Sequence, residues 1–572
     1  MRPRLIALFF SAALLALSCS HGEQTLHIVT TGDVHGNWFD EPYIEGQATK
    51  TSLMSVHAWV DSLRRAVGKQ NVLLLDAGDC LQGDNAPYYY NYVDTDGEHL
   101  FVQLMAYMGY DAIAVGNHDI EAGHAVYDKV AAQLRGHGIP FLGANAVCED
   151  EDDETYFPAY KVFRRGGFKV AVIGFTNPNI EAWLDEPVWE GMEFESLLDC
   201  VQDWVDDVRE KERPDVVVVL THSGSGEGDG SSLESEGLDL LQELEGVDVL
   251  ICAHDHRPFV TEKDGTWLID GGARAGNVGH AVITKSKEHG KQVRGEYVRM
   301  DKNKVDRAMK EHFRPAFEAV KAFTLQPVGE LTAELRTRDA YSGMCDYAAL
   351  IHMVQLEASG AQISFVAPLT FDGTVAAGQV IFNDMFTIYP FENQLYVVKM
   401  KGSEIRDYLE YSYDNWIQTP GEHVLKIVNE PDPRTGAERW SFAGRTYNFD
   451  SAAGIYYTVD VTKPFGKRVK ITSLADGSPF KLDAWYTAAM TSYRASGGGD
   501  ILMKGAGLSK DEAEDRIEER LPEVREMVYQ YFKKHGTVGI SDFGNRAVLG
   551  EWHFVPEKTV VPLFEKDLSL IF

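Results

Sequence analysis

Six short apolar runs in the first half of the chain each end in a group of small and polar residues. They lie within residues 26–36, 71–83, 111–119, 169–179, 215–224 and 248–256. Continuous apolar runs of this length indicate strands that are buried on both faces. Helix-like segments such as 51–67 and 194–211 lie between several of them. Strands that alternate with helices predict a layered α/β sheet.

Polar side chains gather where these runs end, and α/β sheets bind their ligands at the carboxyl ends of the strands. The group comprises two carboxylates, four imidazoles and one amide: Asp33, His35, Asp79, Asn117, His222, His254 and His256. Seven ligands are too many for one metal ion with an open position, but they suit two ions that share a bridging carboxylate. The sequence therefore predicts a site for two divalent cations.

The order of these motifs, which is DxH, GDxxQG, GNHD, TH and HxH, resembles the metallophosphoesterase superfamily. With features of the second half, about residues 25–530 resemble the bacterial 5′-nucleotidase and 2′,3′-cyclic-nucleotide 2′-phosphodiesterase family. The resemblance implies an α/β fold with an N-terminal four-layer α/β/β/α sandwich, a linker helix and a C-terminal α+β substrate-binding domain. One departure is Ala253, because the family usually has Gly before the first His of HxH.

The resemblance also implies how the ligands are divided. One metal ion would be held by Asp33, His35, Asp79 and His256, and the second by Asp79, Asn117, His222 and His254. Two such ions polarise phosphoryl oxygens and lower the pKa of a bound water from about 15.7 toward about 7. Zn, Mn, Fe and Co all accept these ligands, so the sequence leaves the identity of the metal open.

His118 follows the predicted ligand Asn117 and is the candidate catalytic residue. The departing nucleoside oxygen needs its charge neutralised, and an imidazole beside the metals can do this as an electrophile or a general acid. The resemblance implies that a carboxylate three residues further on orients this imidazole, and here that residue is Glu121 rather than the commoner Asp. Asp119 is the alternative partner, although adjacent residues face apart on most backbones.

The segment 303–327 predicts a helix between two domains. Apolar residues recur every three or four positions from Val305 to Phe323, as on one face of a helix. Pro315 lies inside this pattern, where a proline is expected to kink the helix. We expect a catalytic domain at 24–302, the linker helix at 303–327, a substrate domain at 328–535 and an extension of unknown role at 536–572.

Two segments of the second half, YPFEN and SYRASGGGD, resemble the segments with which this family holds a nucleobase between aromatic rings. The resemblance implies stacking by Phe391 and Tyr493, with Asn393 and Asp500 as polar supports and Arg494 directed at phosphate or ribose. Stacking contributes about 1 to 3 kcal/mol per base, which is enough to select nucleotides over simple phosphates. The expected partner is therefore a small nucleotide.

The arginines of the second half separate two branches of the family. Typical 5′-nucleotidases carry Gly-rich arginines where this chain has APLTFDGTVAAG, at residues 367–378, which contains none. The motif YRASGG resembles the branch that acts on 2′,3′-cyclic nucleotides and 3′-nucleotides. Arg274, Arg336 and Arg338 are the candidates to replace the absent arginines.

Residues 1–18 predict an export signal, because Arg2 and Arg4 precede a short apolar run that ends in small residues. Cleavage before Cys19 would resemble a bacterial lipoprotein signal, with ordinary cleavage nearby as the alternative. We therefore expect a periplasmic or cell-envelope protein that contacts the membrane only through a lipid on Cys19. The net charge of −33 disfavours polynucleotides as partners of the bulk surface.

Three hypotheses follow. The first is an exported two-metal phosphoesterase that removes phosphate from 5′-, 3′- or 2′,3′-cyclic nucleotides for nucleotide scavenging. The second applies the same chemistry to a UDP-sugar or another small phosphoester. The third is a catalytically silent nucleotide-binding lipoprotein, which the intact ligand set and His118 argue against. The sequence leaves the oligomeric state open.

Overall fold

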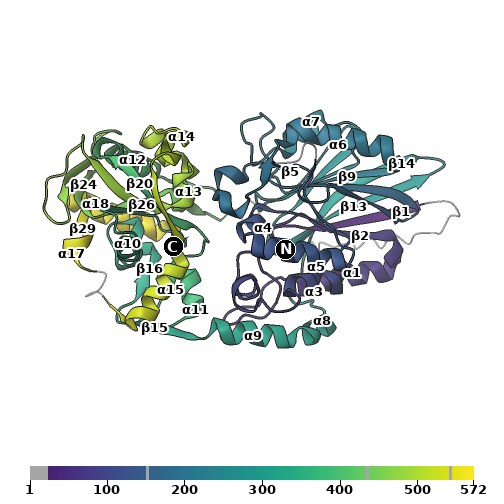
Figure 1. The fold of residues 1–572 in the computed structure, drawn as a ribbon, viewed down its shortest axis with the longest axis horizontal. Coiled ribbons are helices and arrows are strands. Elements are labelled where there is room, and N and C mark those ends of the chain that lie inside the picture. The colour runs from purple at the N-terminus through teal and green to yellow at the C-terminus, as the bar shows by residue number, and fades with distance from the viewer. Residues whose placement is uncertain (1–23, 150–153, 432–436, 540–543) are drawn as a thin grey trace, which may run out of the picture.

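The computed structural model describes residues 24–149, 154–431, 437–539 and 544–572. The predicted export signal and Cys19 lie outside these residues. The chain forms two domains that lie side by side (Figure 1). Helices α8 (Arg307–His312) and α9 (Arg314–Thr324) run along the lower edge of the N-terminal domain in this view and lead to the C-terminal domain.

The N-terminal domain is built on two six-stranded sheets. The first has the order β14 (Gly290–Arg299), β13 (Asn277–Ser286), β1 (Gln24–Thr31), β2 (Val72–Asp76), β3 (Ala112–Ala114) and β4 (Phe141–Leu142). The second has the order β11 (Pro258–Lys263), β12 (Thr266–Gly271), β10 (Val249–Cys252), β9 (Val216–Thr221), β7 (Phe168–Phe175) and β6 (Tyr160–Arg165). Strands β1 to β4 are parallel, and so are β7, β9, β10 and β12.

The apolar residues of these strands fall into three cores. Alternate residues of β2 show the principle, because Leu73 and Leu75 face the second sheet whereas Val72 and Leu74 face helices. Helices α1 (Leu53–Val67), α3 (Leu100–Met108) and α5 (His124–Gly136) cover the outer face of the first sheet, and α6 (Leu197–Glu212) and α7 (Gly237–Glu243) cover that of the second. The predicted four-layer α/β/β/α sandwich is confirmed.

The linker differs in detail from the single kinked helix that the sequence predicted. It consists of two helices that meet at Phe313, and Pro315 lies in the first turn of α9. A proline fits the first turn because its missing N–H has no intrahelical partner there. The ring of Phe317 stacks on Tyr43 at 5.5 Å and contacts Phe39 edge to face, which holds α9 against the N-terminal domain.

The C-terminal domain contains a mixed sheet of five strands. Their order is β23 (Ser451–Ala453), β17 (Ile363–Val366), β26 (Trp485–Thr491), β20 (Gln394–Lys401) and β27 (Ile517–Glu523). Helices α10 (Asp346–Ser359), α11 (Phe382–Ile388) and α15 (Val524–His535) pack in the core on one face, and α12 (Gly402–Trp416) packs in the core on the other. The predicted α+β class of this domain agrees with the sheet and its helices.

The last residues are part of this domain rather than an appendage. Strand β28 (Thr537–Val538) pairs with β15 (Pro327–Leu331), and β29 (Gly550–Val555) pairs with β24 (Ile455–Asp460). Helix α18 (Glu557–Ile571) adds Phe564 to the same core as Trp552 and Trp416. The segment expected to be an extension therefore completes the packing of the domain. Within the described residues, no helix combines the length and apolar character needed to cross a bilayer.

The burial of His352 predicts that the C-terminal domain becomes less stable at acidic pH. His352 of α10 lies in the core between Ser364 and Ser451, and burial lowers its pKa from 6.5 to about 3. Below pH 6.5 the unfolded chain binds a proton that folded His352 does not, so the free energy of unfolding falls by up to about 1.4 kcal/mol per pH unit.

His352→Gln should therefore lose less thermal stability than the wild type between pH 7 and pH 5, as measured by circular dichroism. His289→Gln is the control, because His289 is exposed. Identical pH dependence in the wild type and His352→Gln would contradict the account.

Candidate metal centre and interdomain cavity

Five of the predicted ligands have a backbone conformation that residues other than glycine rarely adopt. The φ angles of Asp33, His35, Asp79, His254 and His256 are +48°, +45°, +61°, +80° and +60°. Left-handed conformations of such residues are strained and cluster at functional sites, where the surrounding structure holds them in place. Each of these residues follows a strand of one of the two sheets, so the turns direct side chains from both sheets toward one region.

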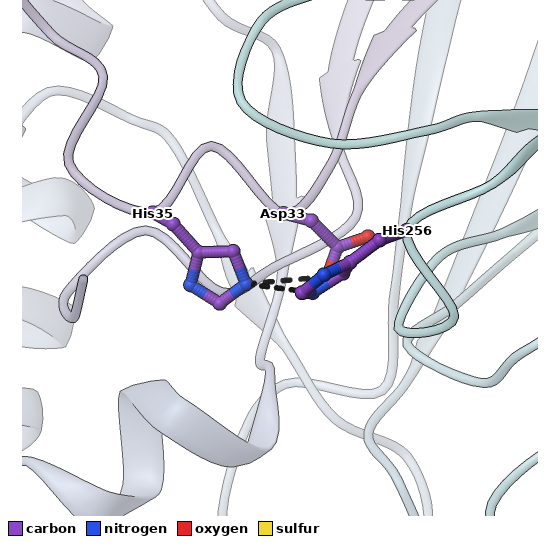
Figure 2. Close-up of side chains that lie close together, drawn as sticks. All are labelled: Asp33, His35 and His256. Carbon is purple, nitrogen blue, oxygen red and sulfur yellow. Dashed lines mark hydrogen bonds and ion pairs between the residues drawn. The ribbon is translucent and has the colours of Figure 1, made fainter. Parts of the chain in front are cut away.

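The first group of ligands joins Asp33 and His35, which follow β1, with His256, which follows β10 (Figure 2). The Nε2 atoms of His35 and His256 lie 2.9 Å apart. Asp33 Oδ1 lies 3.6 Å from His256 Nε2 and 3.9 Å from His35 Nε2. Donors about 2.0–2.2 Å from one metal ion lie about 3 Å or slightly more from each other, so this group can hold one ion.

The second group joins Asp79, which follows β2, with His222 and His254, which follow β9 and β10. Asp79 Oδ2 lies 3.1 Å from His222 Nε2 and 3.9 Å from His35 Nε2 of the first group. Asn117 Oδ1 lies 3.0 Å from His254 Nδ1. All seven predicted ligands are therefore brought together, with the Asp79 carboxylate between the two groups.

The chemistry of these donors fits divalent cations. Among the described residues, Asp33 Oδ1, Asp79 Oδ2 and His222 Nε2 are buried atoms without a hydrogen bond of acceptable geometry. Burial raises the pKa of Asp33 to about 7, although His222 opposes the shift. Buried charges of this kind require a partner, and two cations would supply one to both carboxylates.

Neighbouring groups fix the ligands. His222 Nδ1 lies 2.7 Å from the Ala77 carbonyl oxygen, so Nε2 is left to face the carboxylates. The backbone N–H of His254 donates to Asp33 Oδ2 at 2.8 Å. Such outer contacts orient metal ligands and raise their basicity. Ala253 is not in a left-handed conformation, so its methyl group is accommodated where the family usually has glycine.

The structure distinguishes the two acidic candidates beside His118. His118 Nδ1 pairs with the Glu121 carboxylate. Asp119 instead accepts the backbone N–H groups of four residues, Asp79, Cys80, Leu81 and Gly116. Glu121 is therefore the partner of His118, and Asp119 holds the turn that carries Asp79. Burial lowers the pKa of His118, but Glu121 and Asp79 outweigh it and raise this pKa to about 10.

A cavity of about 810 Å³ lies between the two domains and opens onto the metal ligands. Asn117, His118 and His254 line it from the N-terminal domain, and Phe391 and Tyr493 line it from the C-terminal domain. Its volume is within the range of about 300–1,000 Å³ that small-molecule sites occupy. A single small ligand can therefore contact the metal ligands and the aromatic wall.

The residues predicted to bind substrate are only partly brought to this cavity. Phe391, Asn393 and Tyr493 line it, as expected. Tyr447 lines it too and contacts Tyr493 edge to face at 6.4 Å. Tyr447 carries no local sequence signal that separates it from other tyrosines, which is why the sequence did not indicate it.

Two of the predicted substrate residues have other partners. Arg494 is 4% exposed and forms a two-pronged ion pair with Asp450, with bonds of 3.0 Å, and it also donates to the carbonyl of Tyr447. Its guanidinium therefore holds the wall of the cavity rather than reaching a phosphate. Asp500 pairs with Lys504 at 2.8 Å and does not line the cavity. Arg494 therefore lines the cavity with its guanidinium engaged by Asp450, and Asp500 lies outside the cavity; a role of either residue in substrate binding stays a prediction.

The candidate replacement arginines do not supply a cation to the cavity either. Arg338 pairs with Asp372, and Arg336 lies 3.4 Å from Asp339. Arg274 donates its backbone N–H to the Asp33 carbonyl, and neither it nor the other two lines the cavity. The arginines that line it, besides Arg494, are Arg257 and Arg445.

The geometry predicts two cation sites with different sensitivities to mutation. His256→Ala should abolish one Mn²⁺ site and spare the other. Asp79→Asn should weaken both by about 10-fold or more, because its carboxylate faces both groups. Isothermal titration calorimetry of the metal-stripped protein measures both effects, with His289→Ala as the control. A single site in the wild type would contradict the arrangement.

Comparison with known proteins agrees with this architecture. The family model described as calcineurin-like phosphoesterase matches residues 26–258, and that described as 5′-nucleotidase, C-terminal domain matches residues 327–505. The chain is 24% identical to the 2′,3′-cyclic-nucleotide 2′-phosphodiesterase/3′-nucleotidase of Salmonella typhimurium, over 85% of this chain and 84% of the relative. It is also 24% identical to the 5′-nucleotidase of Vibrio vulnificus, over 83% and 85% of the two chains.

The fold is similar to that of a Staphylococcus aureus protein crystallised with α-ketoglutarate, with a TM-score of 0.76 and 20% identity, over 93% of this chain and 99% of that one. The 5′-nucleotidase precursor of Thermus thermophilus matches with a TM-score of 0.60 and 22% identity, over 93% and 100% of the two chains. The chain belongs to the 5′-nucleotidase family, whose members join a calcineurin-like metallophosphoesterase domain to a 5′-nucleotidase C-terminal domain, and it is a metallophosphoesterase hydrolase of that family.

Proposed function

We propose that this protein is an exported phosphoesterase that hydrolyses 2′,3′-cyclic nucleotides and 3′-nucleotides to nucleoside and phosphate for nucleotide scavenging. The observation that carries the proposal is the cavity itself. It places the predicted ligands Asn117, His254 and His256 at the wall formed by the N-terminal domain. Phe391, Tyr447 and Tyr493 lie at the wall formed by the C-terminal domain. A nucleotide has a phosphate for the first wall and a base for the second, because base stacking on aromatic side chains contributes about 1 to 3 kcal/mol.

The charge of the substrate domain favours the 3′ and cyclic esters over the 5′ ester. Residues 367–378 contain no arginine and contribute only Ala367 and Leu369 to the cavity. Arg494 is neutralised by Asp450. Of the described residues that line the cavity, Arg445 is then the one further cation that the substrate domain offers to a phosphate. Relatives named for 2′,3′-cyclic phosphodiesterase and 3′-nucleotidase activity match over most of this chain, as do relatives named 5′-nucleotidase.

The chain's own residues would act as follows. The seven ligands would hold two divalent cations, which polarise a phosphoryl group and supply hydroxide at neutral pH when bound. His118 faces the cavity beside Asn117. Its Nδ1 is engaged by Glu121, so Nε2 is the atom that can donate to a phosphoryl oxygen or to the departing nucleoside oxygen. The His118 backbone N–H donates to Asp79 Oδ1 at 2.9 Å, which ties its position to the carboxylate that lies between the two ligand groups.

Export is part of the proposal. Residues 1–18 carry Arg2, Arg4 and an apolar run, and Cys19 follows small residues, so a lipid anchor at Cys19 and a periplasmic or cell-envelope location are proposed. An extracytoplasmic nucleotidase would convert nucleotides to nucleosides for uptake.

Metabolic labelling with a palmitate analogue should mark the wild type but not Cys19→Ser.

A substrate panel tests the specificity. With Mn²⁺, phosphate release from 2′,3′-cyclic AMP with a coupling phosphatase, and from 3′-AMP directly, should exceed release from AMP by at least about 10-fold in kcat/KM. Faster hydrolysis of AMP would contradict the 3′ assignment. Hydrolysis of a UDP-sugar alone would favour the second phosphoester hypothesis, and no hydrolysis with nucleotide binding would favour the silent binding protein.

Variants of the acidic and basic residues near the metals should separate catalysis from folding. His118→Asn should lower kcat by about 10²- to 10⁴-fold with the fold intact, because it removes a group that acts on the departing oxygen. Glu121→Gln should lower kcat less, and Asp119→Asn should lower thermal stability, since its carboxylate accepts four backbone N–H groups. Kinetics and thermal unfolding of the same preparations measure this. Wild-type kcat in His118→Asn would contradict its role.

A further inference from the structure

Of the predicted ligands Asp79, His222 and His254, His254 depends most on neighbouring residues to hold its side chain in place. Its backbone has a left-handed conformation with φ of +80°. Its side chain is 17% exposed and lines the cavity, whereas His222 and Asp79 of the same group are almost completely buried. A strained and partly exposed ligand keeps its orientation only if neighbouring groups hold the ring.

Trp183 supplies that support. Its ring lies parallel to the His254 imidazole, with centroids 5.2 Å apart and an interplanar angle of 18°. His222 contacts His254 edge to face at 5.4 Å. The indole therefore covers a face of the imidazole that would otherwise be open to the cavity, and Trp183 lines this cavity as well.

The segment that carries Trp183 is anchored to the metal centre. It follows β7, and Asn177 at its start donates to the carbonyl oxygens of His222 and Glu234, both at 3.1 Å. Ile180 is fully buried, and its carbonyl accepts the N–H of Trp183 at 2.9 Å. The position of the indole is therefore set by backbone contacts on its N-terminal side.

The same segment is tied to the other domain two residues further on. Asp185, which is 11% exposed, lies 3.1 Å from Arg520 Nε on β27 of the C-terminal domain. Arg520 also stacks over the Tyr396 ring on the neighbouring strand β20 at 5.2 Å. One short segment thus joins a ligand of the metal centre to the sheet of the substrate domain.

We infer that Trp183 is a positioning residue for His254, and that the pair Asp185–Arg520 couples the placement of Trp183 to the contact between the domains. Contact with the substrate domain therefore stabilises the metal group of Asp79, His222 and His254, whereas the group of Asp33, His35 and His256 does not depend on this contact. The inference rests on the metal centre of the proposed function but not on the identity of the substrate.

Measurements of Mn²⁺ affinity test whether Trp183 positions His254. Titration of the metal-stripped full-length protein with Mn²⁺, with calorimetric detection, should show that Trp183→Ala weakens one of the two sites by about 10- to 100-fold and leaves the other unchanged. Trp183→Phe should restore most of the affinity, because its ring can still stack on the imidazole. Trp485→Ala is the matched control, since Trp485 is an exposed tryptophan of the C-terminal domain.

Variants of Asp185 and Arg520 test the proposed coupling to the substrate domain and leave Trp183 unchanged. Arg520→Ala and Asp185→Asn should each weaken the same site by about 2- to 5-fold, as expected for a partly exposed pair, and the double variant should be no weaker than either single one. Glu518→Gln is the control, because Glu518 pairs with Lys399 within the C-terminal domain.

Three outcomes would overturn the inference: unchanged Mn²⁺ affinity in Trp183→Ala, equal weakening of both sites, or an effect of Trp485→Ala as large as that of Trp183→Ala. If Trp183→Ala does not fold, the Mn²⁺ affinities of Trp183→Phe and Arg520→Ala provide the test. Wild-type Mn²⁺ affinity in Arg520→Ala would then contradict the coupling between Trp183 and the contact of the two domains. A wild type that binds two Mn²⁺ ions but hydrolyses no nucleotide would refute the proposed function and leave this inference standing.

Discussion

The rest of the structure depends on the two buried carboxylates that meet between the sheets. Asp33 is completely buried and Asp79 is 1% exposed, and an oxygen of each has no hydrogen bond within the described residues. Two such charges repel each other and are costly to remove from water. Histidines from both sheets surround them, and cations bound between these side chains would offset the repulsion. Metal binding would therefore stabilise this part of the N-terminal domain.

The two-layer arrangement of the sheets explains how distant residues meet. Parallel strands place their carboxyl ends at one edge, and two stacked sheets place two such edges together. The turns after these strands then bend sharply, and five ligands adopt left-handed φ angles. The backbone strain at these positions is offset by hydrogen bonds such as that from His254 N–H to Asp33 Oδ2 and by the four that Asp119 accepts. Both sheets therefore contribute ligands to the metal centre, and the substrate domain completes the cavity beside it.

The sequence was sufficient to predict residues whose chemical type and whose position at the end of a strand both indicate a metal ligand. Strand ends that carry His, Asp and Asn predicted the layered fold and the group of seven ligands, and the spacing of Glu121 from His118 favoured it over Asp119. The sequence was insufficient where a residue's partner is distant in the chain. Arg494 looked free to bind phosphate, but Asp450, 44 positions away, neutralises it. Tyr447 lines the cavity because of how its loop folds. Pro315 lies in the first turn of α9, which begins at Arg314, and not in the interior of a longer helix.

The central claim is that the Asp79 carboxylate bridges two cations held by ligands from both sheets. The most direct measurement is anomalous diffraction at the Mn edge from crystals of the Mn²⁺-loaded protein. The account predicts two anomalous peaks, one beside Asp33, His35 and His256 and one beside Asn117, His222 and His254, each about 2.2 Å from an Asp79 oxygen. A single peak, or two peaks of which only one contacts Asp79, would contradict it.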